Sequence, residues 1–425
     1  MPEPILLRGG RVVCPVTATD GVLDVHIVDG VVAEVGADLA AAGAREIDCT
    51  HAIVAPGWTD LGTELCDPGM CYREDLISGS EAGAAGGFTT LVASPATDPV
   101  VDTPAVAADV VARAKTVSGA QVMQSGALTI GLAGERLAEV GLMVEAGCVA
   151  LADGRRTLAD ADVLRRVLQY VRPFDVPVLL RPGEPSLEKG GVMHEGAASM
   201  HAGLRGIPAA AEELGIARIV ALVRATGTRV HLTHVTTASG VARVRAAKAD
   251  GLPLTAAVPA RHLLLNDQAV EASVYDTATR LLPPLRAEAD RLACLAAVRD
   301  GTLDTITADH VPWTRVEKEL EFMHASPGAN GLETALGAAW AALEGEAATV
   351  VQALAVGPAA VIGRTAQVAV GAPADLVVFH PKREWPVAAP YRSRGGFDPL
   401  AGRSLPAAVG LTLVAGEVVY GPRTD

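Results

Sequence analysis

Residues 55–69 read APGWTDLGTELCDPG, and the interpretation of the whole chain starts from them. The residues that follow Trp58 alternate in character, which predicts one short strand running into an Asp-Pro-Gly turn. Side chains two positions apart on a strand point the same way, so Asp60, Gly62 and Glu64 share one side. We therefore expect these three positions to face a common site at the end of the strand.

Beyond this strand, apolar strand-like runs alternate with Ala-rich helical patterns, which indicates repeated βα units and a parallel sheet. The candidate strands are residues 58–62, 89–93, 121–124, 149–152, 176–181, 229–233, 252–256 and 305–308. The clearest helical patterns between them cover residues 160–170, 208–225, 238–250 and 287–300. Eight such units over roughly 300 residues predict an α/β fold of the (β/α)8 TIM-barrel type, which typically needs about 250 residues.

Both ends of the chain carry a different pattern, in which short β-like runs are separated by Gly and Asp turns. Residues 4–49 show it first, and it returns beyond residue 364 in VAVGAPADLVVFH and VGLTLVAGEVVY. We expect the two ends to pair in one small β domain. The predicted organisation is residues 1–55 and 365–425 for this domain and residues 56–364 for the barrel.

Composition excludes several classes of protein. The formal net charge of −14 argues against nucleic acid as a partner, and an aromatic content of 3% leaves few side chains for stacking on bases. Charge-free apolar stretches of about 18 residues are absent, so no membrane partner is expected. The six cysteines are scattered rather than set in a disulfide framework, which favours reduced thiols and a cytoplasmic location.

Chemical groups of a barrel enzyme lie at the C-terminal ends of its strands. Those positions hold Gly62, Glu64, Asp153, Arg181, His234 and Asp309. This pattern of positions resembles the amidohydrolase superfamily and, within it, the dihydroorotases of de novo pyrimidine biosynthesis. The segments GLRGIPAAAEELGIAR, HLTHVTTASGVARVRAAKADG, DGTLDTITADHVP and GAPADLVVF carry the resemblance, which extends over almost the whole chain.

The resemblance implies a metal centre whose ligands this chain has partly lost. The first strand of the family reads D-x-H-x-H, whereas Gly62 and Glu64 stand at the two histidine positions here. Arg181 stands at the position of a third histidine. The bridging acid corresponds to Asp153, the remaining histidine to His234 and the general base to Asp309.

The substrate-binding groups that the resemblance implies have changed as well. Cys66 stands where the family has an arginine for the substrate carboxylate, Ala96 where it has an asparagine, and Trp313 where it has a histidine. We regard Cys66, Ala96 and Trp313 as remnants of a substrate pocket.

These losses favour a degenerate site. A binuclear zinc centre needs several nitrogen or oxygen ligands for each ion, and Arg181 adds a positive charge that cannot be titrated away. We therefore expect no metal, and we expect Arg181 to pair with Asp153 or Glu64. The resemblance then implies a non-catalytic dihydroorotase-like subunit that supports the assembly of aspartate carbamoyltransferase, with a homo-oligomer as a further possibility.

An alternative stays open. Glu64, Asp153, His234 and Asp309 could converge on one cation, because carboxylates and imidazole suit zinc or manganese. The chain would then be an active cyclic amidohydrolase of the dihydroorotase type, with zinc as cofactor and Asp309 as general base.

Overall fold

We describe the protein from a computed structural model, which covers residues 3–421. Eight parallel strands form the barrel, and each pairs with the next one along the chain. They are β6 (Trp58–Thr63), β7 (Phe88–Ala93), β8 (Gln121–Ala127), β9 (Ala150–Ala152), β10 (Val178–Leu180), β13 (Val230–Leu232), β14 (Leu254–Pro259) and β15 (Thr305–Thr307). All eight predicted strands are present, and the (β/α)8 barrel is confirmed.

Asp60 links the first and last strands of the barrel. One carboxylate oxygen accepts hydrogen bonds from the Thr307 hydroxyl at 2.7 Å and from the Ala308 N–H at 2.8 Å. The other accepts the Thr63 hydroxyl within the same strand. Further along, the Glu64 N–H donates to the His310 carbonyl at 3.1 Å. Asp60 is completely buried, so its carboxylate serves the closure of the ring and does not face an open site.

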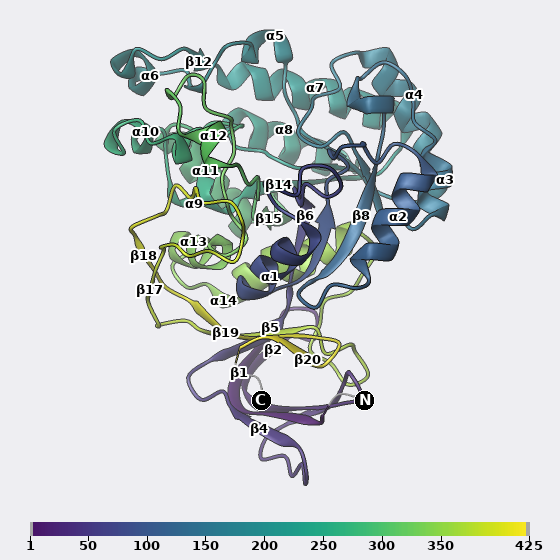
Figure 1. Ribbon diagram of the computed structural model, residues 1–425, viewed down its shortest axis with the longest axis vertical. Coiled ribbons are helices and arrows are strands. Elements are labelled where there is room, and N and C mark those ends of the chain that lie inside the picture. Colours follow the sequence, from purple (N-terminus) through teal and green to yellow (C-terminus); the bar gives the residue numbers. More distant parts are fainter. Residues whose placement is uncertain (1–2, 422–425) are drawn as a thin grey trace.

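Helices cover the outside of the barrel (Figure 1). The main ones are α1 (Leu76–Ala85), α2 (Pro104–Ala114), α3 (Val140–Glu145), α4 (Ala161–Val171), α7 (Ala209–Thr226), α8 (Ala238–Ala249), α11 (Glu288–Arg299) and α13 (Ala335–Ala342). Helix α4 shows why the sequence folds this way. The Asp160 carboxylate caps its first turn by accepting two backbone N–H groups. Its buried side chains recur at the helical period, so one face packs on the core.

The two ends of the chain build one mixed sheet. From the N-terminal end come β1 (Ile5–Cys14), β2 (Thr19–Val28), β3 (Val31–Gly36), β4 (Arg45–Asp48) and β5 (Ile53–Pro56). From the C-terminal end come β16 (Leu376–His380), β19 (Ala408–Val414) and β20 (Glu417–Tyr420). Strands β5 and β16 join the two groups in antiparallel register, with Val54 opposite Val378. The predicted pairing of the two ends is therefore present, while the boundary residues 55 and 365 stay a prediction.

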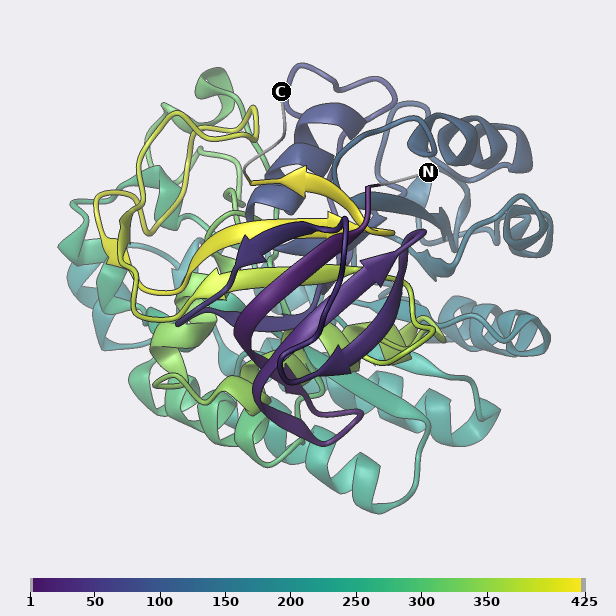
Figure 2. The same ribbon diagram turned by 90° about the horizontal axis from the view of Figure 1, so that it is seen from below.

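Seen from below, strands from both ends of the chain lie across one end of the barrel (Figure 2). Phe379 of β16 makes the contact, since its ring centroid lies 5.9 Å from that of Trp58 and 5.2 Å from that of Trp340. Trp58 begins β6, so the sheet covers the start of this strand. The C-terminal ends of the barrel strands, where chemistry is expected, point the other way.

A long excursion between β10 and α7 was not anticipated. It contains α5 (Pro185–Glu188), β11 (Met193–His194), α6 (Ala197–Ala202) and β12 (Gly206–Ile207). Together with α10 (Gln268–Ala272) it forms a small apolar cluster of its own around Met193, Val270 and Phe322. Among residues 3–421, no helix is both long and apolar enough to cross a membrane.

Candidate active site

Glu64, Asp153, Arg181, His234 and Asp309 all lie just beyond the C-terminal ends of their strands. The barrel therefore brings the five positions to one mouth, as parallel strands in a ring require. Proximity does not make them one cluster, however. Only His234 and Asp309 contact each other directly, with 3.0 Å between the imidazole Nε2 and the carboxylate Oδ1.

Arg155 completes the centre of the mouth, and the sequence analysis missed it. Its guanidinium donates a hydrogen bond to Asp309 Oδ1 and forms an ion pair with that carboxylate, whose side chain is 1% exposed. Burial by itself would raise the pKa of Asp309, but Arg155 and His234 more than reverse this effect and hold it well below the ordinary value. Asp309 is therefore an ionised carboxylate that is already neutralised by a cation of the chain itself.

His234 is the neutral member of this cluster. Burial lowers the pKa of its imidazole, although the neighbouring Asp309 carboxylate opposes the shift. Its Nδ1 lies 2.6 Å from the Thr233 hydroxyl, which fixes the ring from the other side.

Glu64 lies close enough to Arg155 for the two to influence each other. Burial raises the pKa of Glu64, while the Arg155 guanidinium acts in the opposite direction. In turn, Asp309 and Glu64 both stabilise the charged form of Arg155. The guanidinium is thus paired with Asp309 and acts on Glu64 through its charge, while its Nη2 and the Asp309 Oδ2 have no hydrogen-bond partner among the described residues. We call Glu64, Arg155, His234 and Asp309 the mouth cluster.

Asp153 is turned away from the mouth cluster. One of its oxygens accepts the backbone N–H groups of Leu128 and Thr129 at 2.9 and 3.0 Å. The other accepts the Thr129 hydroxyl at 2.6 Å. Asp153 therefore holds the loop after β8, and its strongest acceptor positions are occupied.

The predicted partner of Arg181 was wrong. Its guanidinium makes two parallel hydrogen bonds of 2.7 Å to both carboxylate oxygens of Glu188, and its Nε donates to the Arg155 carbonyl. Neither Asp153 nor Glu64 contacts it. The cause is the short helix α5, which returns Glu188 to the end of β10 only seven residues after Arg181.

Comparison with known proteins places this architecture. The profile of the family described as "Dihydro-orotase-like" matches residues 51–239. A dihydroorotase from Anaeromyxobacter dehalogenans strain 2CP-1 is 42% identical over 99% of this chain and 98% of its own length. A dihydroorotase from Pelotomaculum thermopropionicum is 41% identical over 99% of both chains. The chain belongs to the dihydroorotase-like family.

Solved structures agree on the fold of this dihydroorotase-like chain. The L-hydantoinase (dihydropyrimidinase) from Arthrobacter aurescens superposes with a TM-score of 0.87, covering 99% of this chain and 96% of its own, at 22% sequence identity. A D-hydantoinase from Bacillus sp. AR9 gives a TM-score of 0.83 at 24% identity, covering 98% of this chain and 95% of its own. The shared architecture is the (β/α)8 barrel together with the β domain built from both ends of the chain.

The three pocket remnants of this dihydroorotase-like chain have structural contacts. Cys66 is buried in a left-handed backbone conformation, and burial raises the pKa of its thiol. The Arg73 guanidinium lies over the Trp313 ring, 4.2 Å from the ring centroid. The indole N–H of Trp313 donates to the Pro327 carbonyl. Ala96 lies beside Gly154, where a Cβ on that glycine would come within 3.2 Å of the alanine methyl.

A second buried pair lies beside this site. His310 Nε2 is 3.3 Å from a Glu74 oxygen, and both side chains are fully buried. The other ring nitrogen accepts the Gly331 N–H, so this histidine is committed to a structural network. Glu74 was not singled out from sequence, although its acidic side chain in the family-like segment GMCYREDL was a visible signal.

A binuclear metal centre does not fit these side chains as they lie. Within residues 3–421, no group of three or more His, Cys, Asp or Glu side chains is arranged to hold a metal ion. The chemistry explains this result, because Asp153 is bonded to its own loop and Asp309 is neutralised by Arg155. Glu64 and His234 supply too few donors for two ions.

Proposed function

We propose that this dihydroorotase-like protein of de novo pyrimidine biosynthesis is a catalytically degenerate subunit. The observation that carries the proposal is Arg155, which forms an ion pair with the buried Asp309 carboxylate and whose charged form is also stabilised by Glu64. The positive charge beside these two acids is therefore already present. The chain itself supplies the charge.

A guanidinium that belongs to the chain differs from a bound metal ion in its electrostatic and chemical properties. Arginine stays protonated in proteins, so Arg155 cannot give up its charge to admit a divalent cation. Like charges about 4 Å apart cost about 4 kcal/mol per unit charge product at an effective dielectric of about 20. A guanidinium also cannot activate water as a Lewis acid does. The buried charges of the mouth cluster are thus balanced in the folded protein without a metal ion, and the cluster does not catalyse hydrolysis.

The test is metal content together with activity. We expect purified protein to hold no stoichiometric zinc or manganese, and to interconvert carbamoyl aspartate and dihydroorotate no faster than buffer when either metal is added. An Arg155→Gln variant should take up more zinc than the unchanged protein, because it frees the Asp309 carboxylate and removes the positive charge near Glu64. One tightly bound metal ion per chain with turnover in the unchanged protein would overturn the proposal.

We further propose that the chain assembles with aspartate carbamoyltransferase, the partner that the family resemblance implies. Mixing the two purified proteins should produce a species heavier than either one in native mass measurement. The chain measured alone is the control, because a homo-oligomer would appear there as well. If the mixture contains only the separate species, the partner is wrong.

An active cyclic amidohydrolase of dihydroorotase type is the second candidate. The names of relatives at 41–42% identity favour it, and the hydrogen-bonded pair of His234 and Asp309 is the element of the mouth that could move a proton. It would use zinc, and it would require Arg155 and Asp153 to leave the partners described above. Asp309→Asn should abolish this activity, whereas Asp300→Asn, an exposed change on the outside of the barrel, should leave it unchanged.

A further inference from the structure

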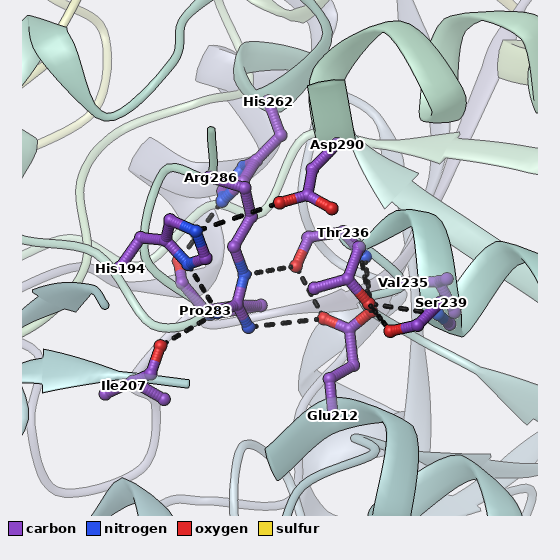
Figure 3. A network of polar contacts seen from close by, with 12 residues as sticks. His194, Ile207, Glu212, Val235, Thr236, Ser239, His262, Pro283, Arg286 and Asp290 are labelled. Atoms are coloured by element: carbon purple, nitrogen blue, oxygen red, sulfur yellow. Dashed lines mark hydrogen bonds and ion pairs between the residues drawn. The ribbon is translucent and has the colours of Figure 1, made fainter. Parts of the chain in front are cut away.

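The buried polar network around Arg286 is complete without a ligand. The guanidinium donates to the Thr236 hydroxyl at 3.1 Å and to the Ile207 carbonyl at 3.3 Å, and its Nη2 donates to a Glu212 oxygen at 3.4 Å (Figure 3). Its Nη1 also donates to His194 Nδ1 at 3.4 Å. Every nitrogen of this guanidinium therefore has an acceptor within the chain.

A cleft of about 430 Å³ lies at the other end of the barrel. Its wall includes residues that directly precede barrel strands, such as Arg229 before β13 and Asp304 before β15. The rest comes largely from the chain after the last barrel strand, in α14 (Ala347–Val351), η4 (Gln352–Val356) and α15 (Gly357–Val361). Because the strands are parallel, their starts lie opposite the mouth, and the cleft is separate from the mouth cluster.

Most of the cleft wall is apolar, and it includes the side chains of Leu252, Val298, Leu303, Ala353 and Val361. Small-molecule sites typically have volumes of about 300–1,000 Å³ and apolar walls with a few polar groups. The segment η4 in this wall is a π-helical turn, a rare geometry that often occurs at functional sites. The cleft is therefore suited to the apolar part of a small molecule.

Arg229 supplies this apolar cleft with a donor that is not used within the chain. Its Nη2 donates to the Asp175 carbonyl at 2.7 Å, and the Asp175 carboxylate lies 3.7 Å away with its side chain 96% exposed. The Nε of Arg229 is buried and has no acceptor among the described residues. A buried N–H group without an acceptor costs free energy, so an acceptor on a ligand would stabilise it.

The acidic group of the cleft wall is already neutralised. Asp304 forms an ion pair with Lys248 at 2.7 Å. The Thr255 hydroxyl, also in the wall, lies 2.9 Å from His231 Nδ1. In the described part of the chain, Arg229 is the wall residue with a buried side-chain nitrogen or oxygen that lacks a hydrogen-bond partner. A ligand with a negatively charged polar end therefore complements this wall.

We propose that this cleft binds an organic monocarboxylate with an unbranched apolar chain, whose carboxylate accepts hydrogen bonds from Arg229. The Nε and a terminal nitrogen of a guanidinium present parallel donors, which match the two oxygens of a carboxylate. The chain of the ligand then lies along the apolar wall. The proposal goes beyond the proposed function, because it concerns the opposite end of the barrel and holds whether or not the mouth is catalytic.

The probes are hexanoate and octanoate, and octylammonium is the control with the same chain as octanoate and the opposite charge. Calorimetric titration of the full chain should show binding of both acids and none of octylammonium. Octanoate should bind about 15-fold more tightly than hexanoate, because each buried methylene group contributes about fourfold.

Arg229→Gln should weaken octanoate binding by about 10- to 100-fold, because it removes the charged hydrogen-bond partner. The matched control is Arg224→Gln, since Arg224 is an exposed arginine that pairs with Asp250 outside the cleft. Thermal unfolding reports whether Arg229→Gln folds. Leu252→Ala is the second variant, and it should weaken octanoate binding about fourfold or more through loss of apolar contact.

N-acetyl-leucine presents a carboxylate on a peptide-like carrier. If it binds more tightly than octanoate, the cleft is a site for the C-terminus of a protein and the proposal is overturned. Equal affinities for hexanoate and octanoate, comparable binding of octylammonium, or unchanged octanoate affinity in Arg229→Gln would each refute it as well.

Discussion

Replacing Arg155 by glutamine tests the account of the mouth cluster most directly. The change keeps a polar side chain of similar shape but removes the charge that neutralises Asp309, whose side chain is 1% exposed. Leaving one member of a buried ion pair uncompensated typically costs about 3–5 kcal/mol. For a chain of 425 residues this corresponds to a fall of about 3–6 °C in Tm, using about 2.1 cal/mol/K of unfolding entropy per residue.

The pH dependence gives a second readout of the same substitution. In the unchanged protein the folded pKa of Asp309 lies well below its unfolded value, so the stability it contributes is present above about pH 4 and is lost below it. Without Arg155, burial dominates and raises that pKa, so the variant loses stability as the pH rises toward neutrality. The gap between the two proteins should therefore be largest near pH 7.5 and smaller at pH 5.

Urea unfolding followed by circular dichroism at both pH values measures the gap. Arg156→Gln is the matched control, because Arg156 is the exposed neighbour and donates to the Leu132 carbonyl without an ion pair. It should change the free energy of unfolding by about 0.5 kcal/mol or less. If Arg155→Gln costs no more than Arg156→Gln, or if the gap is the same at both pH values, Arg155 does not neutralise the site.

Two further substitutions test other buried charges. Burial lowers the pKa of Lys318 to about 7, so the unfolded chain binds the extra proton between about pH 7 and pH 10 and stability should rise with pH there. Lys318→Met should flatten that rise in urea unfolding at pH 7 and 9.5, and a slope equal to that of the unchanged protein would contradict it. Glu212→Gln breaks a pair whose side chains are 2–4% exposed and should cost about 3–5 kcal/mol. Its neighbour Glu213 has a side chain that is 33% exposed and pairs with Arg243 at the surface, so Glu213→Gln should cost about 1 kcal/mol or less. Equal costs for the two substitutions would contradict this prediction.

Much of the fold could be predicted because its signals are local. Strand β10 is the run VLL between a proline and an arginine, and α4 shows its helical period within eleven residues. Such patterns report burial on one or both faces of an element, wherever the element comes to lie. The excursion between β10 and α7 was missed because its elements are only two to six residues long, too short for a period to emerge.

The candidate site was predicted by position but not by pairing. Glu64, Asp153, Arg181, His234 and Asp309 do lie at one mouth, since the ends of parallel strands must. The partners differ, because Arg155 lies 154 residues from Asp309 and follows a short strand as an ordinary loop arginine. The pairing of Arg181 with Glu188 could have been predicted from the sequence, because the two residues are only seven positions apart and a helical turn that begins at a proline lies between them.

The sequence by itself determined which segments are buried and which residue types stand at the ends of the strands. Both follow from the spacing of side chains along a chain of fixed geometry. Only the tertiary structure decided that Arg155 pairs with Asp309, that Asp153 accepts hydrogen bonds from the loop after β8, and that Arg181 pairs with Glu188. Coulomb attraction and hydrogen bonding depend on separation through space, and the closure of the ring sets that separation independently of distance along the chain.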